Sequence, residues 1–435
     1  MRCPDAVREV DVARPQVPAR ADRPSRLRRV GAVLTSLTAV VATTVVAGPA
    51  RALAEGGPCA LPRDGVHHSE GLDTWNTSYP RPVRSLDALM IFLSFPDSEP
   101  YTTPEELVSD HFPATADFFR RASYGQFDLR VHPAKRWITM PEDSTAYAIQ
   151  RDWPADRRTD YLRDAVEVAD PRVDFARYDL VYLVADPDAP GIDADATKVV
   201  NFERPLRADG TALRRLVTVF ENHPPDQHVL AHETGHVFDL PDLYRRPTGA
   251  GGDGGGDWDT RVGDWDLMGS QFGLAPDPFG WHKWKLGWIG ERQIDCVHTA
   301  GTTLHTLEPI GAPMTRGVPG TDTRTRLIVV RTGPRTALVV EARGTYGNDA
   351  GICAEGVLVY RVRSDVASGD GPVTVLDGHP DSEGCPDESV YPKLADAPLG
   401  AGESLDVSAD GVRVEVRART TSGAWTVRIT QGDRR

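Results

Sequence analysis

The segment His232-Glu233-Thr234-Gly235-His236 carries the residue types and the spacing that zinc-dependent hydrolysis requires. On a helix, residues four apart lie one above the other, so both imidazoles would project to one side and hold one Zn²⁺. Zinc lowers the pKa of a bound water from about 15.7 to about 7 and polarises the carbonyl under attack. Glu233 would lie beside that water and accept its proton. We therefore expect His232 and His236 as zinc ligands and Glu233 as the catalytic base, with a chance match as the alternative.

Asp242 is the residue that we expect to complete the zinc ligands. It follows His236 by six residues, and Pro241 should end the helix just before it, so the chain can return a carboxylate to the metal. Alternatively, Asp242 has only a structural role, in a turn or as a helix cap.

Met268 lies in a short run of turn-forming residues, 263–269 (GDWDLMG). A methionine held in such a turn could form the apolar floor under a zinc site. The alternative is that Met268 is an ordinary core residue, since methionine commonly fills gaps in hydrophobic cores.

These motifs resemble those of the immune inhibitor A family of secreted bacterial metalloproteases. The likeness covers roughly residues 86–365 and rests on 231–236 (AHETGH), 240–244 (LPDLY), 265–269 (WDLMG), 284–288 (WKLGW), 95–97 (FPD), 123–125 (SYG), 173–175 (VDF), 178–179 (YD) and 340–343 (VEAR). The resemblance implies a zincin fold of the metzincin type, with Met268 in a Met-turn. It also implies zinc held by His232, His236 and Asp242, with Glu233 as the general base.

The chain departs from related motifs three residues after the second histidine, where Asp239 replaces the usual glycine. Glycine permits the positive φ that a sharp turn needs, and aspartate tolerates that conformation better than most residues. Asp239 should therefore be an acceptable substitute. It also leaves open that Asp239, rather than Asp242, reaches the metal.

Other polar and aromatic residues near the motif are weaker candidates. One histidine could contact substrate, aromatic residues could shape a cleft, and aspartates in a Gly-rich loop could bind Ca²⁺ through their oxygens. The ordinary alternatives are surface or core histidines, aromatic packing and a solvated loop. The residues concerned are His223, His228, His282, Tyr244, Trp265, Asp253, Asp257, Asp259, Asp264 and Asp266.

Composition sets the class of protein. The chain has 435 residues, of which 40% are hydrophobic and 26% charged, with a net charge of −14. These values exclude a disordered chain, a collagen and a polytopic membrane protein, and leave room for about two domains. An acidic chain without a basic patch outside its N-terminus is not expected to bind nucleic acid.

Residues 1–54 are typical of a signal peptide. Arginines up to Arg29 precede an uncharged apolar stretch, 30–48, and the small-residue pattern 52–54 (ALA) offers a cleavage site before Glu55. An uncleaved membrane anchor is the alternative, and the paired Arg28-Arg29 leaves the export route open. We expect a secreted protein without stable membrane association after cleavage.

Cysteine usage agrees with export. Four cysteines remain after the leader, and on spacing we favour the pairs Cys353–Cys385 and Cys59–Cys296. A second possibility is that the Cys59 thiolate blocks the zinc until its segment is removed.

The order of predicted elements gives an α+β fold. Buried strands are predicted at 86–95 and 178–184, and helices at 104–122 and 157–168. After residue 295, short strands recur at 327–331, 336–341, 356–361, 412–416 and 425–429, which is typical of an antiparallel sandwich. We expect an irregular arm at 55–82, a zincin-like metalloprotease domain at 83–293 and a β-rich, sandwich-like domain at 294–435.

These features together predict a secreted zinc endopeptidase that acts on proteins or peptides through a zinc-bound water activated by Glu233. Two alternatives remain. One is a non-catalytic extracellular binding protein on a zincin fold, and the other is a zinc hydrolase of a non-protein amide such as peptidoglycan.

Overall fold

The computed structural model describes residues 57–63, 68–246, 257–314 and 322–432, all of which belong to one compact unit. The predicted signal peptide, residues 1–54, lies outside the described residues, as does Asp253. No helix among the described residues is both long and apolar enough to cross a membrane.

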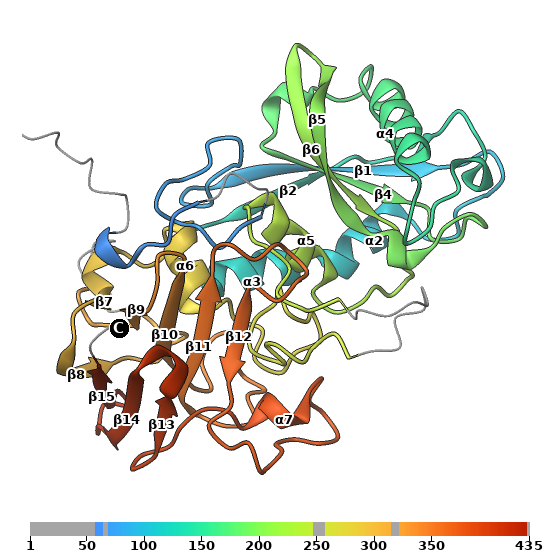
Figure 1. The fold of residues 1–435 in the computed structure, drawn as a ribbon. Helices are drawn as coiled ribbons and strands as arrows, with labels where there is room; N and C mark the ends of the chain where they lie inside the picture. Colours follow the sequence, from blue (N-terminus) through green and yellow to red (C-terminus); the bar gives the residue numbers. More distant parts are fainter. Residues whose placement is uncertain (1–56, 64–67, 247–256, 315–321, 433–435) are drawn as a thin grey trace, which may run out of the picture. The chain divides into compact units, whose positions relative to one another are not determined.

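Helices and strands alternate in the first half of the chain, and strands predominate in the second (Figure 1). The α-helices are α2 Pro104–His111, α3 Ala114–Ala122, α4 Ala155–Ala169, α5 Val229–Val237, α6 Gly280–Leu286 and α7 Pro392–Ala395. The strands are β1 Leu86–Ser94, β2 Leu129–Pro133, β3 Ile138–Thr139, β4 Leu180–Ala185, β5 Lys198–Ala208, β6 Thr211–Val219, β7 Ile294–Val297, β8 Gly301–Leu307, β9 Leu327–Arg331, β10 Thr336–Arg343, β11 Gly356–Arg363, β12 Val373–Leu376, β13 Ser404–Val407, β14 Val412–Arg419 and β15 Trp425–Gln431. Single 3-10 turns are η1 Gly57–Cys59, η2 Ser144–Tyr147, η3 Phe175–Arg177, η4 Ala194–Ala196, η5 Glu291–Gln293 and η6 Ser408–Asp410. The α+β class predicted from the sequence is confirmed.

The first sheet has the order β2-β1-β4-β6-β5, with β3 also pairing with β1. Its pairs are parallel except for β5, which lies antiparallel to β6 and forms an edge. Side chains of a strand alternate between the two faces of its sheet. In β1, Met90 and Phe92 therefore join the core of α3 and α5, while Ile91 and Leu93 join the core of α4. The His232–His236 motif on α5 thus lies on one face of this sheet.

Two further sheets, β12-β11-β10-β9-β7 and β13-β14-β15-β8, pack against each other through a shared core that includes Val340 and Val427. The opposite face of the first of these two sheets, with Val339 and Tyr360, belongs to the same core as α3, α5 and α6. The boundary at residue 293/294 remains a prediction, and the residues on its two sides share one continuous core.

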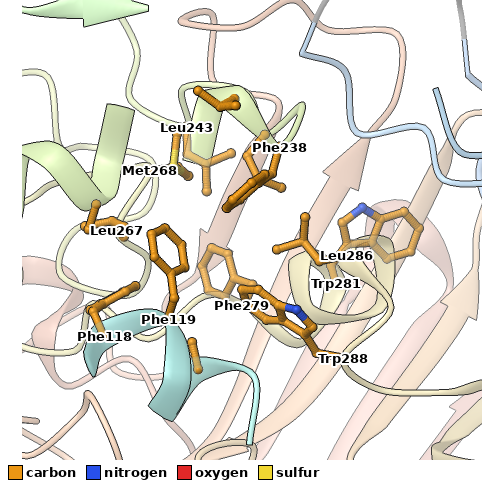
Figure 2. Packing of buried hydrophobic residues seen from close by; sticks show 14 of the residues in the cluster. Phe118, Phe119, Phe238, Leu243, Leu267, Met268, Phe279, Trp281, Leu286 and Trp288 are labelled. Atoms are coloured by element: carbon orange, nitrogen blue, oxygen red, sulfur yellow. The ribbon is translucent and has the colours of Figure 1, made fainter. Parts of the chain in front are cut away.

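Aromatic side chains fill the core that joins these parts. Figure 2 shows Phe119 of α3, Phe238 after α5, and Trp281 and Trp288 around α6 in one cluster with Met268. Phe127 packs edge-on against Phe238, with ring centroids 5.4 Å apart. Such pairs stabilise a core beyond the area that they bury.

Glu341 and Arg343 lie on β10 and connect the sheet β12-β11-β10-β9-β7 to the loop that carries Met268. Both are fully buried, and their side chains form an ion pair of 3.0 Å. Arg343 also pairs with Asp349 at 2.9 Å and donates to the carbonyls of Trp265 and Ala275, each at 2.9 Å. Because the guanidinium finds so many acceptors, its burial leaves few donors unsatisfied.

The structure corrects two of the predicted elements. The segment 104–122 is not one helix but two, α2 and α3, because Pro113 offers no backbone N–H and its ring cannot fit inside a helix. Proline favours the first turn of a helix, so the sequence predicts that Pro224 and Pro225 open the helix of the motif. The helix instead begins at Val229, and it ends at Val237, before Pro241.

Both predicted disulfides are present, Cys59–Cys296 and Cys353–Cys385. The first joins the N-terminal arm to β7. Because Cys59 is disulfide-bonded, the alternative in which its thiolate blocks a metal is wrong.

Candidate metal centre

Helix α5 carries the His232–His236 motif and is buried inside the protein. All of its residues are buried, including His232, Glu233 and His236. It begins after His228, which has a φ of 61°, and its end is closed by Leu240, whose N–H donates to the Gly235 carbonyl at 3.1 Å. The chain then reverses, and this brings Asp242 back toward the helix.

His232, His236 and Asp242 meet at one point. Asp242 Oδ1 lies 3.4 Å from His232 Nε2 and 3.0 Å from His236 Nε2. One ligand atom from each of the three residues lies within 4.8 Å of the others. The predicted ligand set is therefore assembled, and among the described residues it is the one such group of three or more.

The outer nitrogens of the two imidazoles fix how the rings are oriented. His232 Nδ1 lies 2.9 Å from the Leu267 carbonyl, and His236 Nδ1 lies 2.8 Å from the Leu240 carbonyl. A carbonyl oxygen only accepts hydrogen bonds, so each Nδ1 must carry the proton and donate. Each Nε2 is then the nitrogen left to bind a cation, as in metal-ligating histidines whose other N–H is held by a backbone carbonyl.

His236 and Asp242 shift each other's pKa. Burial alone would lower the pKa of His236, but the nearby Asp242 carboxylate raises it to about 9. Burial would raise the pKa of Asp242, yet the charge of His236 holds it well below its usual value. In the absence of a metal these shifts favour a proton shared by His236 and Asp242, and metal binding would release it.

Glu233 lies on the same helix between the two histidines. Its side chain is buried, and burial raises its pKa above the usual value for a glutamate. Its Oε2 accepts a hydrogen bond of 2.9 Å from the backbone N–H of Val199, on edge strand β5. This contact fixes the carboxylate between the helix and the edge of the sheet.

Met268 packs directly against the helix between the two histidines. A Cβ atom added at Gly235 would lie only 2.5 Å from Met268 Sδ, so this position of the helix must be glycine for the methionine to approach. The backbone of Met268 is held as well, because its N–H donates to Asp266 Oδ1 at 2.7 Å and its carbonyl accepts from Leu243 at 2.9 Å. The predicted apolar floor is thus in contact with α5 (Figure 2).

Asp239 occupies the turn after the helix with a φ of 66°, as expected for a residue that replaces glycine. Its carboxylate points to the N-terminal arm rather than to the histidines. It forms an ion pair with Arg63, accepts the His68 N–H at 3.0 Å and lies 3.6 Å from Lys285 Nζ. The alternative in which Asp239 is the third ligand finds no support in this arrangement.

We predict that Asp239→Gly destabilises the protein, although glycine suits the backbone better. Relief of the positive φ would gain about 1 kcal/mol. Loss of the buried partner of Arg63 and Lys285 would cost about 3–5 kcal/mol. The free energy of unfolding in urea should therefore fall by about 2–4 kcal/mol.

Ala148→Gly is the matched control for this prediction. Ala148 is exposed and has a φ of 51°, so glycine removes strain there without removing a polar contact. We expect no loss of stability in the control. An Asp239→Gly protein that is as stable as the wild type would show that the ion pairs contribute nothing net.

The N-terminal arm also contacts the ligands from outside. The ring of His68 stacks on that of His236, with centroids 5.0 Å apart and an interplanar angle of 17°. Burial, followed by the charge of His236, lowers the pKa of His68 to about 3. His68 therefore contributes a neutral ring that covers one side of a predicted ligand.

A second arm residue, Glu70, belongs to a buried chain of charged groups under the site. His282 Nε2 lies 3.0 Å from Glu70 Oε1, and His282 Nδ1 lies 2.9 Å from Asp266 Oδ2. None of the three side chains is exposed. The Asp266 carboxylate thus joins His282 to the backbone of Met268, so the arm is connected to the floor of the site.

Tyr244 is hydrogen-bonded to Asp242 and so lies beside the site. The other remaining candidates lie in ordinary surroundings. His223 forms an exposed pair with Asp110, His228 packs near Phe118, and the buried Trp265 donates to the Leu394 carbonyl. Tyr244 stacks edge-on against Trp258, and burial, with the charge of Asp242, raises its pKa. In the Gly-rich loop, Asp257 accepts the Asp259 N–H, burial raises the pKa of Asp259 to about 7, and Asp264 and Asp266 accept backbone N–H groups. Calcium binding stays a prediction.

Sequence reasoning missed several residues that contact the motif or Asp242, among them Val199, His68 and Ser368. Val199 could have been found, because Asp209-Gly210 is a typical two-residue hairpin turn and therefore indicates strands on both sides. His68 and Ser368 come from an irregular arm and from a loop 126 residues beyond Asp242, and no local pattern marks them.

In comparisons with known proteins, neither a family profile nor a curated sequence matches this chain.

Proposed function

We propose that this protein is a secreted zinc endopeptidase, with a zincin-like centre of the metzincin type such as the likeness to the immune inhibitor A family implies. One observation carries the proposal. His232 and His236 each donate Nδ1–H to a backbone carbonyl, and both Nε2 atoms face the same oxygen of Asp242. Two imidazoles, neutral once a metal replaces the proton, and one carboxylate are a ligand set that catalytic zinc uses, with one position left for water.

The residues around this ligand set could perform hydrolysis. When bound, zinc would supply Lewis acidity, polarising a peptide carbonyl and acidifying a water. Glu233 would accept the proton of the attacking water and pass it to the nitrogen of the leaving amine. Met268 and the two backbone carbonyls would keep the histidines in place.

Two features support export of the protein. The leader predicted at residues 1–54 would direct it out of the cell, and the two disulfides suit an oxidising compartment. Protein or peptide substrates would then be met outside the cell.

The test is metal analysis combined with casein hydrolysis on protein that starts at Glu55. We expect one zinc per chain, casein cleavage that stops when a chelator is added, and recovery when zinc is restored. Protein that binds no zinc would instead favour the non-catalytic binding protein. Protein that binds zinc and cleaves peptidoglycan but not casein would favour the non-protein amide hydrolase.

A further inference from the structure

The third predicted ligand, Asp242, is held by a residue from the β-rich half of the chain. Ser368 lies in the loop between β11 and β12, and its Oγ donates a hydrogen bond of 3.1 Å to Asp242 Oδ2. The same hydroxyl oxygen accepts the backbone N–H of Asp242 at 2.9 Å. One hydroxyl thus contacts both the backbone and the carboxylate of the aspartate, and this fixes the side chain relative to its own backbone.

Backbone hydrogen bonds hold this loop against the segment that carries Asp242. The Gly369 N–H donates to the Asp242 carbonyl at 3.1 Å, and the Arg246 N–H donates to the Gly369 carbonyl at 3.0 Å. Arg245 and Asp370 form an antiparallel bridge beside them. Gly369 has a φ of 76°, and a Cβ there would come within 2.7 Å of the Arg246 guanidinium. The loop therefore lies close to Asp242 in a conformation that glycine permits.

The two oxygens of Asp242 consequently have different surroundings. Oδ1 faces both imidazole nitrogens, whereas Oδ2 is engaged by the Ser368 hydroxyl. Without that hydroxyl, Oδ2 would lose the Ser368 hydrogen bond and the Asp242 N–H would lose its acceptor. The carboxylate could then rotate, or offer both oxygens to a cation.

We infer that Ser368 is a positioning residue of the metal centre, which keeps Asp242 a one-oxygen ligand and makes the β11–β12 loop part of the site. This inference rests on the proposed function. It assigns a role in metal binding to the C-terminal half of the chain. Groups that hydrogen-bond to a metal ligand typically change metal affinity about 10- to 100-fold when they are removed.

The experiment compares Ser368→Ala with the wild type, both starting at Glu55, by competition between protein and a chelator for zinc. We expect the zinc dissociation constant to rise about 10- to 100-fold in the variant. The second measurement is the visible spectrum with Co²⁺ in place of zinc. Its intensity falls as the number of ligands rises, so we expect a weaker band in Ser368→Ala than in the wild type.

Two further variants separate positioning from folding. Ser364→Ala makes the same change at the start of the same loop, where the hydroxyl is buried and lacks a hydrogen-bond partner among the described residues. We expect it to match the wild type in affinity and spectrum. Ser368→Thr keeps a hydroxyl at the half-buried position and should restore both. Melting temperatures without metal show whether any variant has lost its fold.

The outcomes distinguish this inference from the proposed function. If the wild type binds zinc and Ser368→Ala shows the same affinity and the same cobalt spectrum, Ser368 has no positioning role, while the proposed function stands. Equal weakening by Ser364→Ala would also overturn the inference, because the effect would then belong to the loop in general. If the wild type binds no zinc, both proposals fall.

Discussion

Glu233→Gln should abolish casein hydrolysis and leave the zinc content unchanged. Glutamine has nearly the same shape as glutamate and can still accept the Val199 N–H, but it cannot accept a proton from water. General base catalysis contributes about 10²- to 10⁴-fold, so the rate of cleavage should fall by about that factor. Turnover of casein at saturating concentration, with zinc measured on the same samples, checks the prediction.

His236→Ala is the matched control, since it removes a proposed zinc ligand from the next turn of the same helix. We expect this variant to lose both zinc and activity, because two ligands remain where three are needed. The pair of variants separates the base from the metal. Normal activity in Glu233→Gln would show that another group accepts the proton, even if zinc binding were as proposed.

The local elements of the fold could be predicted because their signals lie in short stretches of sequence. The apolar run that became β1 and the alternating strands β9, β10, β11, β14 and β15 agree with their predicted ranges. The spacing of His232 and His236 predicted two rings on one side of a helix, and Asp242 returns to them as expected. The conformation of Asp239 could also be predicted, because only a few residue types tolerate a positive φ.

The surroundings of the motif could not be predicted in the same way, because they come from distant parts of the chain. Glu70 precedes the motif by more than 150 residues and Ser368 follows it by more than 100. A single buried glutamate or a loop serine has no pattern that distinguishes it from its neighbours. Strand β5 is different, because Asp209-Gly210 is a typical hairpin turn and therefore marks in the sequence where this strand ends.

We expect the largest loss of stability from a substitution in the buried cluster of Glu70, His282 and Asp266. His282 is buried between the Glu70 and Asp266 carboxylates, which come from the arm and from the loop of Met268. Burial alone would lower its pKa, but the two carboxylates outweigh that effect and raise the pKa to about 10. His282 is therefore a cation in the folded protein at neutral pH. His282→Ala would leave the two buried carboxylates of Glu70 and Asp266 without the cation between them. Such a loss costs about 3–5 kcal/mol.

The stabilisation by His282 should decrease as the pH rises. The pKa of His282 is higher in the folded protein than its usual value of 6.5, so the stabilisation is complete below pH 6.5. It is lost as the pH rises from 6.5 through about 10. In this range the folded protein keeps a proton that the unfolded chain has released, so each rise in pH favours the unfolded chain. The difference in unfolding free energy between wild type and His282→Ala, measured in urea, should narrow over this range.

His223→Ala makes the same substitution at an exposed histidine, which also pairs with a carboxylate, Asp110. Exposed ion pairs contribute about 0–1 kcal/mol, because water and salt screen them. We therefore expect the His223 variant to lose at most about 1 kcal/mol. If His282→Ala were no more harmful than this control, the arm would not be held to the floor of the site by charge. Other contacts, such as the disulfide from Cys59 and the Arg63–Asp239 pair, would then anchor it.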